Sequence, residues 1–194
     1  MEEVVLENDR VQLLPLSAEL VKQLYHFSLD QPEIWEFSLQ SAAGKENMDA
    51  YFDAAFAAKE LGTSQTFIVY DKHARAFAGS TRFYDYKLAH QTVLLGYTWY
   101  GKAFRGTGLN YHCKYLLLEY AFEKLKIQRV EFRADNNNER SKKAMLKIGV
   151  TAEGILRSDC STPDGKRRDS AVFSILAEEW TNTVKNKIQL LMYR

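Results

Sequence analysis

Apolar residues near the start of the chain follow first a strand period and then a helical one. Residues 11–16 form a mostly apolar run that includes Pro15, and this run predicts a strand. Ser17 follows the run and is a good helix cap, so residues 18–27 are expected to form a short helix. Residues 31–35 predict a turn or a short helical piece.

A longer helix and three strands are expected next. Apolar side chains recur at helical spacing from Met48 to Phe56, which predicts an amphipathic helix over residues 46–61 that ends at Gly62. The period then changes to that of strands, which are expected at residues 66–70, 76–86 and 93–100.

The second half of the chain alternates helices and strands. A helix is expected over residues 111–125, with a buried stripe formed by Tyr111, Tyr115, Leu118, Phe122 and Leu125. Further elements are expected in the order strand 129–134, helix 138–148, strand 150–157, a hairpin at residues 163–165, strand 168–176 and a helix from Trp180 onward. This order predicts an α+β fold with a mixed, mostly antiparallel central sheet flanked by helices.

Length and composition are those of a globular domain. The 194 residues contain three prolines and no linker-like stretch, so residues 1–194 are expected to form a single domain. The formal net charge of +1 does not suit a broad nucleic-acid or membrane surface. Cys113 and Cys160 lie far apart, so we expect neither a disulfide framework nor a metal site. Without a signal peptide or a membrane-spanning run, a cytoplasmic protein is expected.

The most informative stretch for function is the loop at residues 105–110, which lies between a predicted strand and a predicted helix. The first backbone N–H groups of a helix lack partners within the helix, and the helix dipole favours negative charge there. Glycines let the backbone approach phosphate oxygens closely, and Arg105 adds a charged donor. The loop therefore predicts a site for a pyrophosphate-bearing cofactor, whereas the alternative is that Gly106 and Gly108 only make a tight connection.

Two common phosphate loops do not match this stretch. The chain has no G-x-x-x-x-G-K-[ST] pattern, which argues against a P-loop nucleotidase. It also lacks a G-x-G-x-x-G pattern with a later acidic residue, which argues against a Rossmann dinucleotide site.

The loop instead resembles the R/Q-x-x-G-x-G/A pattern of the GNAT family of acetyl-CoA-dependent N-acetyltransferases. Arg105 and Gly108 match, whereas Asn110 stands where Gly or Ala is usual. Three other segments resemble the RimJ/RimL-type, ribosomal-protein alanine acetyltransferase-like subgroup: Leu95-Gly96-Tyr97, Asn138-x-x-Ser141, and the helix end at residues 145–150. The resemblance extends from about residue 94 to residue 180 and is weak over the first 65 residues.

The resemblance implies how acetyl-CoA would be bound. The pyrophosphate would be held by the backbone amides of Arg105, Gly106, Thr107, Gly108, Leu109 and Asn110. The pantetheine would pair with the backbone of Tyr97, Thr98 and Trp99, and the N–H of Thr98 or Trp99 would stabilise the oxyanion. The side chains of Tyr97 and Trp99 are expected in the core or in the pocket wall.

Asn138 and Ser141 are the predicted polar residues near the reacting group. Asn138 is expected to cap its helix and also to contact the cofactor. Ser141 lies one turn further on the same side, and the resemblance implies that it acts as general acid; the alternative is a polar residue of the first helical turn.

The general base is missing from the pattern. Leu94 stands where the subgroup often has a Glu, so a water chain or one of three side chains, His90, Glu131 or Asp159, would have to replace it. Glu131 can also be a solvent-facing residue of its strand.

These expectations predict an enzyme that transfers acetyl from acetyl-CoA to a primary amine by direct attack in a ternary complex. The acceptor would be a protein N-terminus or a small-molecule amine, bound near Trp35 and Asp159. Because Leu94 replaces the usual Glu, a non-catalytic acetyl-CoA sensor or interaction module is the alternative. We expect a monomer or a homodimer with no nucleic-acid partner; the sequence does not identify the acceptor.

Overall fold

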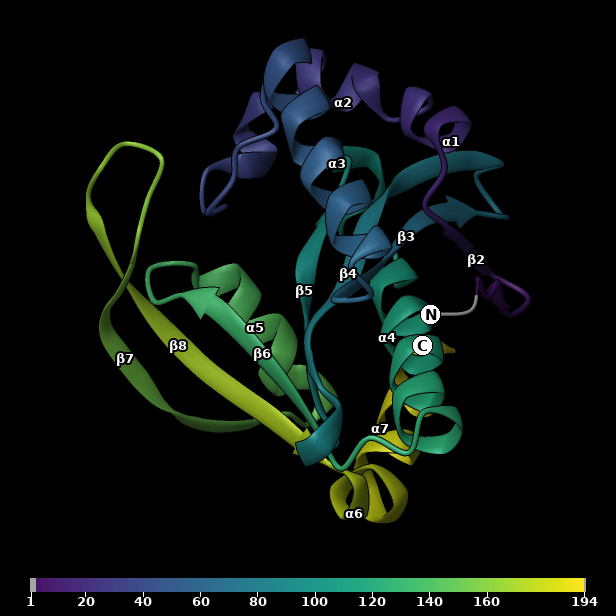
Figure 1. Cartoon of the computed structure of the whole chain (residues 1–194). Coiled ribbons are helices and arrows are strands. Elements are labelled where there is room, and N and C mark those ends of the chain that lie inside the picture. The colour runs from purple at the N-terminus through teal and green to yellow at the C-terminus, as the bar shows by residue number, and fades with distance from the viewer. Residues whose placement is uncertain (1–2, 194) are drawn as a thin grey trace.

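The computed structural model describes residues 3–193, which contain one eight-stranded mixed sheet (Figure 1). The strands are β1 (Leu6–Glu7), β2 (Val11–Pro15), β3 (Ser64–Asp71), β4 (Ala76–Lys87), β5 (Thr92–Tyr100), β6 (Arg129–Asp135), β7 (Thr151–Ser161) and β8 (Arg167–Leu176). Their order in the sheet is β1-β2-β3-β4-β5-β6-β8-β7, and only β5 and β6 pair in parallel. The predicted α+β class with a mostly antiparallel sheet is confirmed.

The helical elements connect the strands. They are α1 (Ala18–Lys22), α2 (Tyr25–Asp30), α3 (Lys45–Glu60), α4 (Leu109–Glu119), α5 (Glu139–Ile148), α6 (Ala177–Glu179) and α7 (Lys185–Met192), together with 3₁₀ turns at Pro32–Trp35, Leu88–His90 and Lys102–Phe104. Short π-helical turns extend α4 through residue 124 and link α6 to α7.

Two apolar cores cover the two faces of the sheet. Residues of α4, α5 and α7 pack on one face, around buried side chains such as Leu117, Phe132 and Ile188. Residues of α1, α2 and α3 pack on the other face, where Tyr51 and Trp99 lie (Figure 1). We call these the α4 face and the α3 face.

The sheet opens between its two parallel strands. The pairing of β5 with β6 runs from Thr92↔Arg129 to Leu94↔Glu131 and ends there, although β5 continues to Tyr100 and β6 to Asp135. Strands that stop pairing while both continue leave one edge of each without a strand partner. The edge of β5 beyond Leu94 is therefore open to a ligand.

Most expected elements are present within a few residues of their predicted bounds, and Ser17 caps α1 by accepting a hydrogen bond from Leu20 N at 3.3 Å. The single helix expected over residues 18–27 is wrong. The backbone N–H groups of Gln23 and Leu24 bond to carbonyls only three residues back, which ends α1 before α2 begins.

The stripe expected on the helix after residue 110 is wrong in part. Leu125 is 37% exposed and Tyr111 and Tyr115 are only partly buried. The helix is covered on more than one side, by the sheet and by α7, so its buried positions are not confined to one stripe. The buried residues of α4 are Leu109, His112, Cys113, Lys114, Leu116, Leu117 and Leu118.

Candidate acetyl-transfer site

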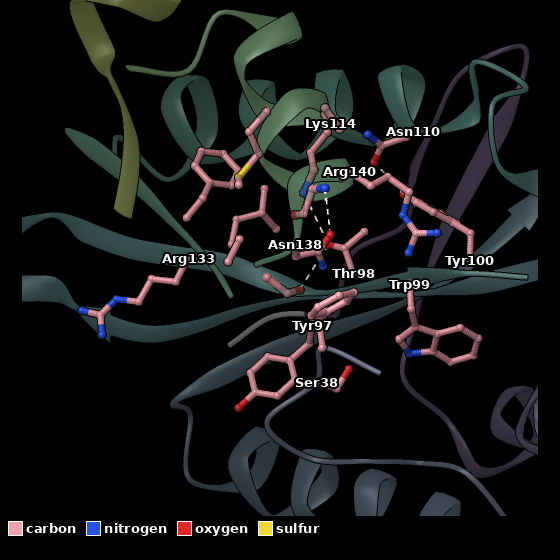
Figure 2. Close-up of a pocket in the computed structure, with 18 of the residues that line it drawn as sticks. Ser38, Tyr97, Thr98, Trp99, Tyr100, Asn110, Lys114, Arg133, Asn138 and Arg140 are labelled. Carbon is pink, nitrogen blue, oxygen red and sulfur yellow. Dashed lines mark hydrogen bonds between the residues drawn. The ribbon is translucent and has the colours of Figure 1, made fainter. Parts of the chain in front are cut away.

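A cleft of about 1190 Å³ lies where β5 and β6 separate, and it reaches both faces of the sheet. Its walls come from β5, β6, the loop before α4, the start of α5, the segment around Ser38 and the β7–β8 hairpin. Figure 2 labels residues of β5, β6 and α5 together with Ser38. All of the site residues predicted from the sequence, except Leu109 and Trp35, line this cleft: Tyr97, Thr98, Trp99, Arg105, Gly106, Thr107, Gly108, Asn110, Asn138, Ser141 and Asp159.

The glycine loop has the form that phosphate binding requires. Gly106 and Gly108 have φ of +76° and +84°, a region that side chains other than glycine rarely adopt. A Cβ on either glycine would meet no atom within 4 Å, so the space in front of both is open. Gly108 is also the N-terminal cap of α4, whose first N–H groups face the loop, while Leu109 is buried beneath it.

Basic side chains surround this loop. The guanidinium of Arg105 donates through Nε to the carbonyl of Tyr100 at 3.0 Å, which fixes its direction. Burial and the nearby Arg140 lower the pKa of Arg105. Six basic and three acidic side chains line the whole cleft, and Arg140 and Lys147 of α5 are among the basic ones. Two guanidinium groups beside a helix N-terminus suit a phosphate-bearing ligand.

The strand β5 carries a bulge at the centre of the cleft. The register with β4 passes from Ser80↔Trp99 to Arg82↔Gly96, so the stretch of β5 between these pairs is one residue longer than that of β4. Tyr97 takes up the extra residue with φ of +48°. The bulge turns Tyr97 and Trp99 to the α3 face, where they join the core, and leaves the hydroxyl of Thr98 facing Thr81 at 2.7 Å.

The start of α5 closes the other side of the cleft. Asn138 is the N-terminal cap, and its Oδ1 accepts from the backbone N–H of Ser141 at 3.0 Å, as expected of a capping asparagine. Ser141 is half-buried and lines the cleft.

The α3 face of the cleft combines aromatic and charged groups. Tyr84 packs edge-on against Tyr97 with ring centroids 5.0 Å apart. Burial raises the pKa of Tyr84 well above its ordinary value, so its hydroxyl stays protonated even in alkaline solution where an exposed tyrosine would ionise. Arg133 approaches Asp159 at 3.6 Å, and both line the cleft.

Trp35 does not line the main cleft. It is buried at 3% exposure with its ring 5.2 Å from that of Trp99, which does line the cleft, and it borders a smaller neighbouring cavity. Its position is therefore one layer behind the wall.

Several residues that line the cleft carry no motif and were missed from sequence. Lys114 of α4 is the least expected, because it is only 6% exposed and points from the α4 face toward Thr98 (Figure 2). Arg168 of β8 is also buried, donating to Ser170 Oγ at 3.2 Å and to the carbonyl of Phe37 at 3.3 Å. Helical periodicity alone gives no signal that a lysine within an apolar helix faces a cleft.

A comparison of the sequence with models of protein families shows which family has this fold and cleft. Residues 10–151 match the model of the acetyltransferase (GNAT) domain, which covers well over half of the chain. The chain belongs to the acetyltransferase (GNAT) domain family. The opened parallel strands and the glycine loop described above both lie within the matched residues.

Individual relatives of this GNAT chain agree with the assignment. It is 30% identical over 105 residues to a Bacillus subtilis (strain 168) protein named "Putative ribosomal N-acetyltransferase YdaF"; the match covers 54% of this chain and 56% of that protein. A crystal structure of an acetyltransferase-like protein of T. thermophilus is 31% identical, with a TM-score of 0.85 over 98% of this chain and 97% of that one. A GCN5-related N-acetyltransferase from Brucella melitensis shares the fold, with 24% identity and a TM-score of 0.89 over 99% and 86% of the two chains.

The GNAT chain departs from the expected family pattern at the position of the general base. Leu94 is buried, and Glu131 lies beside it in register on β6. Both oxygens of Glu131 are already bound, by Arg129 at 3.1 Å and by Arg133 at 2.8 Å. His90 is exposed in the turn after β4 and does not line the cleft. Of the three proposed replacements, only Asp159 lines it.

Two other kinds of feature are absent from residues 3–193. Within that range no helix is both long and apolar enough to cross a membrane. The same part of the chain holds no cluster of three His, Cys, Asp or Glu side chains suited to a metal ion.

Proposed function

We propose that this chain transfers an acetyl group from acetyl-CoA to a primary amine by direct attack in a ternary complex. The observation that carries the proposal is the junction of three features: the glycine loop at the start of α4, the open edge of β5, and a cleft that reaches both faces of the sheet. A cofactor bound at the loop and along this edge would present its acetyl group to an amine that enters from the α3 face.

Each part of the cofactor has a candidate partner. The backbone N–H groups of residues 105–110 would bind the pyrophosphate, with Arg105 as a charged donor. The backbone of residues 97–99 would pair with the pantetheine as an added strand does, and an N–H of Thr98 or Trp99 would stabilise the oxyanion. Asn138 would contact the pantetheine from the start of α5, and Ser141 would act as general acid.

The amine must lose a proton before or as it attacks. We assign its release to a water relay that ends at Asp159, because Asp159 lines the cleft on the acceptor side and is held 3.6 Å from Arg133. The relay replaces the carboxylate that Leu94 cannot provide.

The acceptor class follows from the α3 face. Tyr84, Tyr97 and Trp99 offer an apolar wall, and Asp159 offers a negative charge to an amine. The partial similarity to the Bacillus subtilis protein supports a protein N-terminal amine of the kind that RimJ/RimL-type enzymes acetylate, with small amines as the second class. We also propose that the whole chain acts as one domain, since β8 completes the sheet beyond the family match.

A turnover assay tests this function. Acetyl-CoA is incubated with the protein and a panel of N-terminal peptides and small amines, and free thiol release is followed. We expect amine-dependent release for at least one acceptor class. A raised melting temperature with acetyl-CoA but no release with any amine would favour the non-catalytic sensor instead.

Gly108→Val tests the cofactor site in the same protein. A branched side chain at φ of +84° would fill the open space in front of the loop and remove the increase in melting temperature that acetyl-CoA causes. Gly62→Val is the matched control, because Gly62 has φ of +67°, equally open surroundings and a position after α3, away from the cleft. If both variants keep the increase, the loop does not bind the cofactor.

A further inference from the structure

Lys114 is an uncompensated cation inside the cleft. It belongs to α4, on the α4 face of the sheet, and is 6% exposed. Its Nζ donates a hydrogen bond to the neutral hydroxyl of Thr98 at 3.4 Å and lies 5.4 Å from the centre of the Phe132 ring. Among residues 3–193, no carboxylate lies within ion-pair distance of this ammonium.

The protein groups around Lys114 do not neutralise its positive charge. The Thr98 hydroxyl is shared, since it also contacts Thr81 Oγ1 at 2.7 Å and the carbonyl of Gly96 at 3.3 Å. An aromatic face adds only a modest attraction for a cation. A buried charge with so little compensation is unfavourable unless a ligand provides the opposite charge.

The position of Lys114 indicates which part of a bound cofactor would provide this negative charge. The pyrophosphate site is at the loop before α4, and the cleft ends where β5 and β6 begin to pair at Leu94. Thr98 lies between these two points, beside the bulge at Tyr97, and the oxyanion donor proposed above is Thr98 or its neighbour. Figure 2 shows Lys114 reaching toward Thr98 from the side of the strand opposite Tyr97 and Trp99. Lys114 would therefore face the thioester end of the cofactor from the side opposite the acceptor.

We propose that the ammonium of Lys114 stabilises the coenzyme A thiolate that leaves when the acetyl group is transferred. In that step the acceptor nitrogen bonds to the acetyl carbon and releases its proton to the water relay, the carbon–sulfur bond breaks, and the sulfur keeps the bonding pair. Lys114 stabilises this thiolate while coenzyme A is bound, and Ser141 passes a proton to the sulfur, replaced from water, as coenzyme A leaves. The positive charge of Lys114 lies on the side of the cleft where the sulfur would hold this electron pair. Burial supports the role, because an ion pair is stronger where water is excluded.

This inference rests on the proposed function, since it requires coenzyme A in the cleft. Its test uses binding and not turnover. The affinities of coenzyme A and of desulfo-coenzyme A, which lacks the thiol, are measured at neutral pH for the unmodified protein, Lys114→Met and Lys114→Arg. The ultraviolet absorbance of the thiolate is recorded for each coenzyme A complex, with the desulfo complex as blank.

We expect the unmodified protein to bind coenzyme A at least about tenfold more tightly than the desulfo compound at pH 7, which requires the pKa of the bound thiol to fall from about 8.5 to about 6. Thiolate absorbance should appear in that complex. Lys114→Met should lose both the preference and the absorbance, and Lys114→Arg should keep most of each because it keeps the charge. Lys22→Met is the charge-matched control, since Lys22 is exposed on α1.

Three outcomes separate the possibilities. Equal binding of the two compounds by the unmodified protein overturns the role of Lys114 and leaves the proposed function standing. A preference that survives in Lys114→Met overturns it as well, because another group must then stabilise the thiolate. If the unmodified protein binds neither compound, the proposed function itself fails. Desulfo-coenzyme A binding by each variant shows that its cleft is intact.

Discussion

The stability of the protein without ligand should reflect the unfavourable burial of Lys114. Burial lowers the pKa of Lys114 from 10.5 to about 8. A difference of this size corresponds to a penalty on the order of 3 kcal/mol for keeping the ammonium charged in the folded state. Lys114→Met removes the charge and keeps an unbranched side chain of similar length, so little packing is lost. We expect the variant to be more stable than the unmodified protein at pH 7.

The pKa of Lys114 also determines how the free energy of unfolding changes with pH. Below pH 8 both folded and unfolded chains hold the proton of Lys114, and the folded chain bears the full penalty. Between pH 8 and pH 10.5 the folded chain loses this proton while the unfolded chain keeps it, so the free energy of unfolding rises with pH. The advantage of Lys114→Met should therefore be largest at pH 7 and should shrink by about 2–3 kcal/mol by pH 10.

Urea unfolding followed by tryptophan fluorescence measures this difference, since Trp35, Trp99 and Trp180 are all buried. Other groups titrate over the same range, but they do so in both proteins and cancel in the comparison. The exposed Lys22→Met variant should differ from the unmodified protein by the same small amount at both pH values. If Lys114→Met were more stable than the unmodified protein by the same free energy at pH 7 and at pH 10, the reasoning that burial penalises the charged form of Lys114 would be refuted.

Two further predictions concern turnover. Ser141→Ala should lower the turnover rate by about 10²-fold with little change in the acetyl-CoA dissociation constant, if Ser141 is the general acid; equal rates would reduce it to a polar residue of the first turn of α5. Trp35→Phe should raise the Michaelis constant of the acceptor and leave acetyl-CoA affinity nearly unchanged, because Trp35 supports Trp99 from behind the wall; loss of cofactor affinity instead would mean that the two faces of the site are assigned the wrong way round.

The sequence predicts the fold well because local signals and long-range packing agree over most of the chain. Apolar runs with strand character mark β3 to β6, and a capping residue and a glycine mark the ends of α5. Prediction failed where packing overrides the local pattern. Residues of α4 are covered by both the sheet and α7, so no single stripe describes its buried side, and the break between α1 and α2 has no proline or glycine to announce it.

The geometry of the candidate site was predictable from the sequence where backbone conformation defines it. Glycines at positive φ and a capping asparagine have sequence signatures, so the loop and the start of α5 could be found. The bulge at Tyr97 is an irregularity of register, and no residue type demands it. Lys114 and Arg168 reach the cleft from elements that are distant in sequence, so their roles depend on tertiary structure.

The bulge in β5 has a buried cation on each face of the sheet. Arg82 stacks on the α3 face, 4.4 Å from the ring of Tyr97 and 5.2 Å from that of Tyr51, and its Nε and Nη2 have no hydrogen-bond partner within the described residues. Lys114 approaches Thr98 from the α4 face. Neither the ammonium of Lys114 nor the guanidinium of Arg82 forms an ion pair with a carboxylate of residues 3–193, so a positive charge approaches the bulge from each face of the sheet. We expect such an arrangement to destabilise the protein without ligand and to suit the proposed reaction, in which negative charge develops first on the carbonyl oxygen and then on the sulfur.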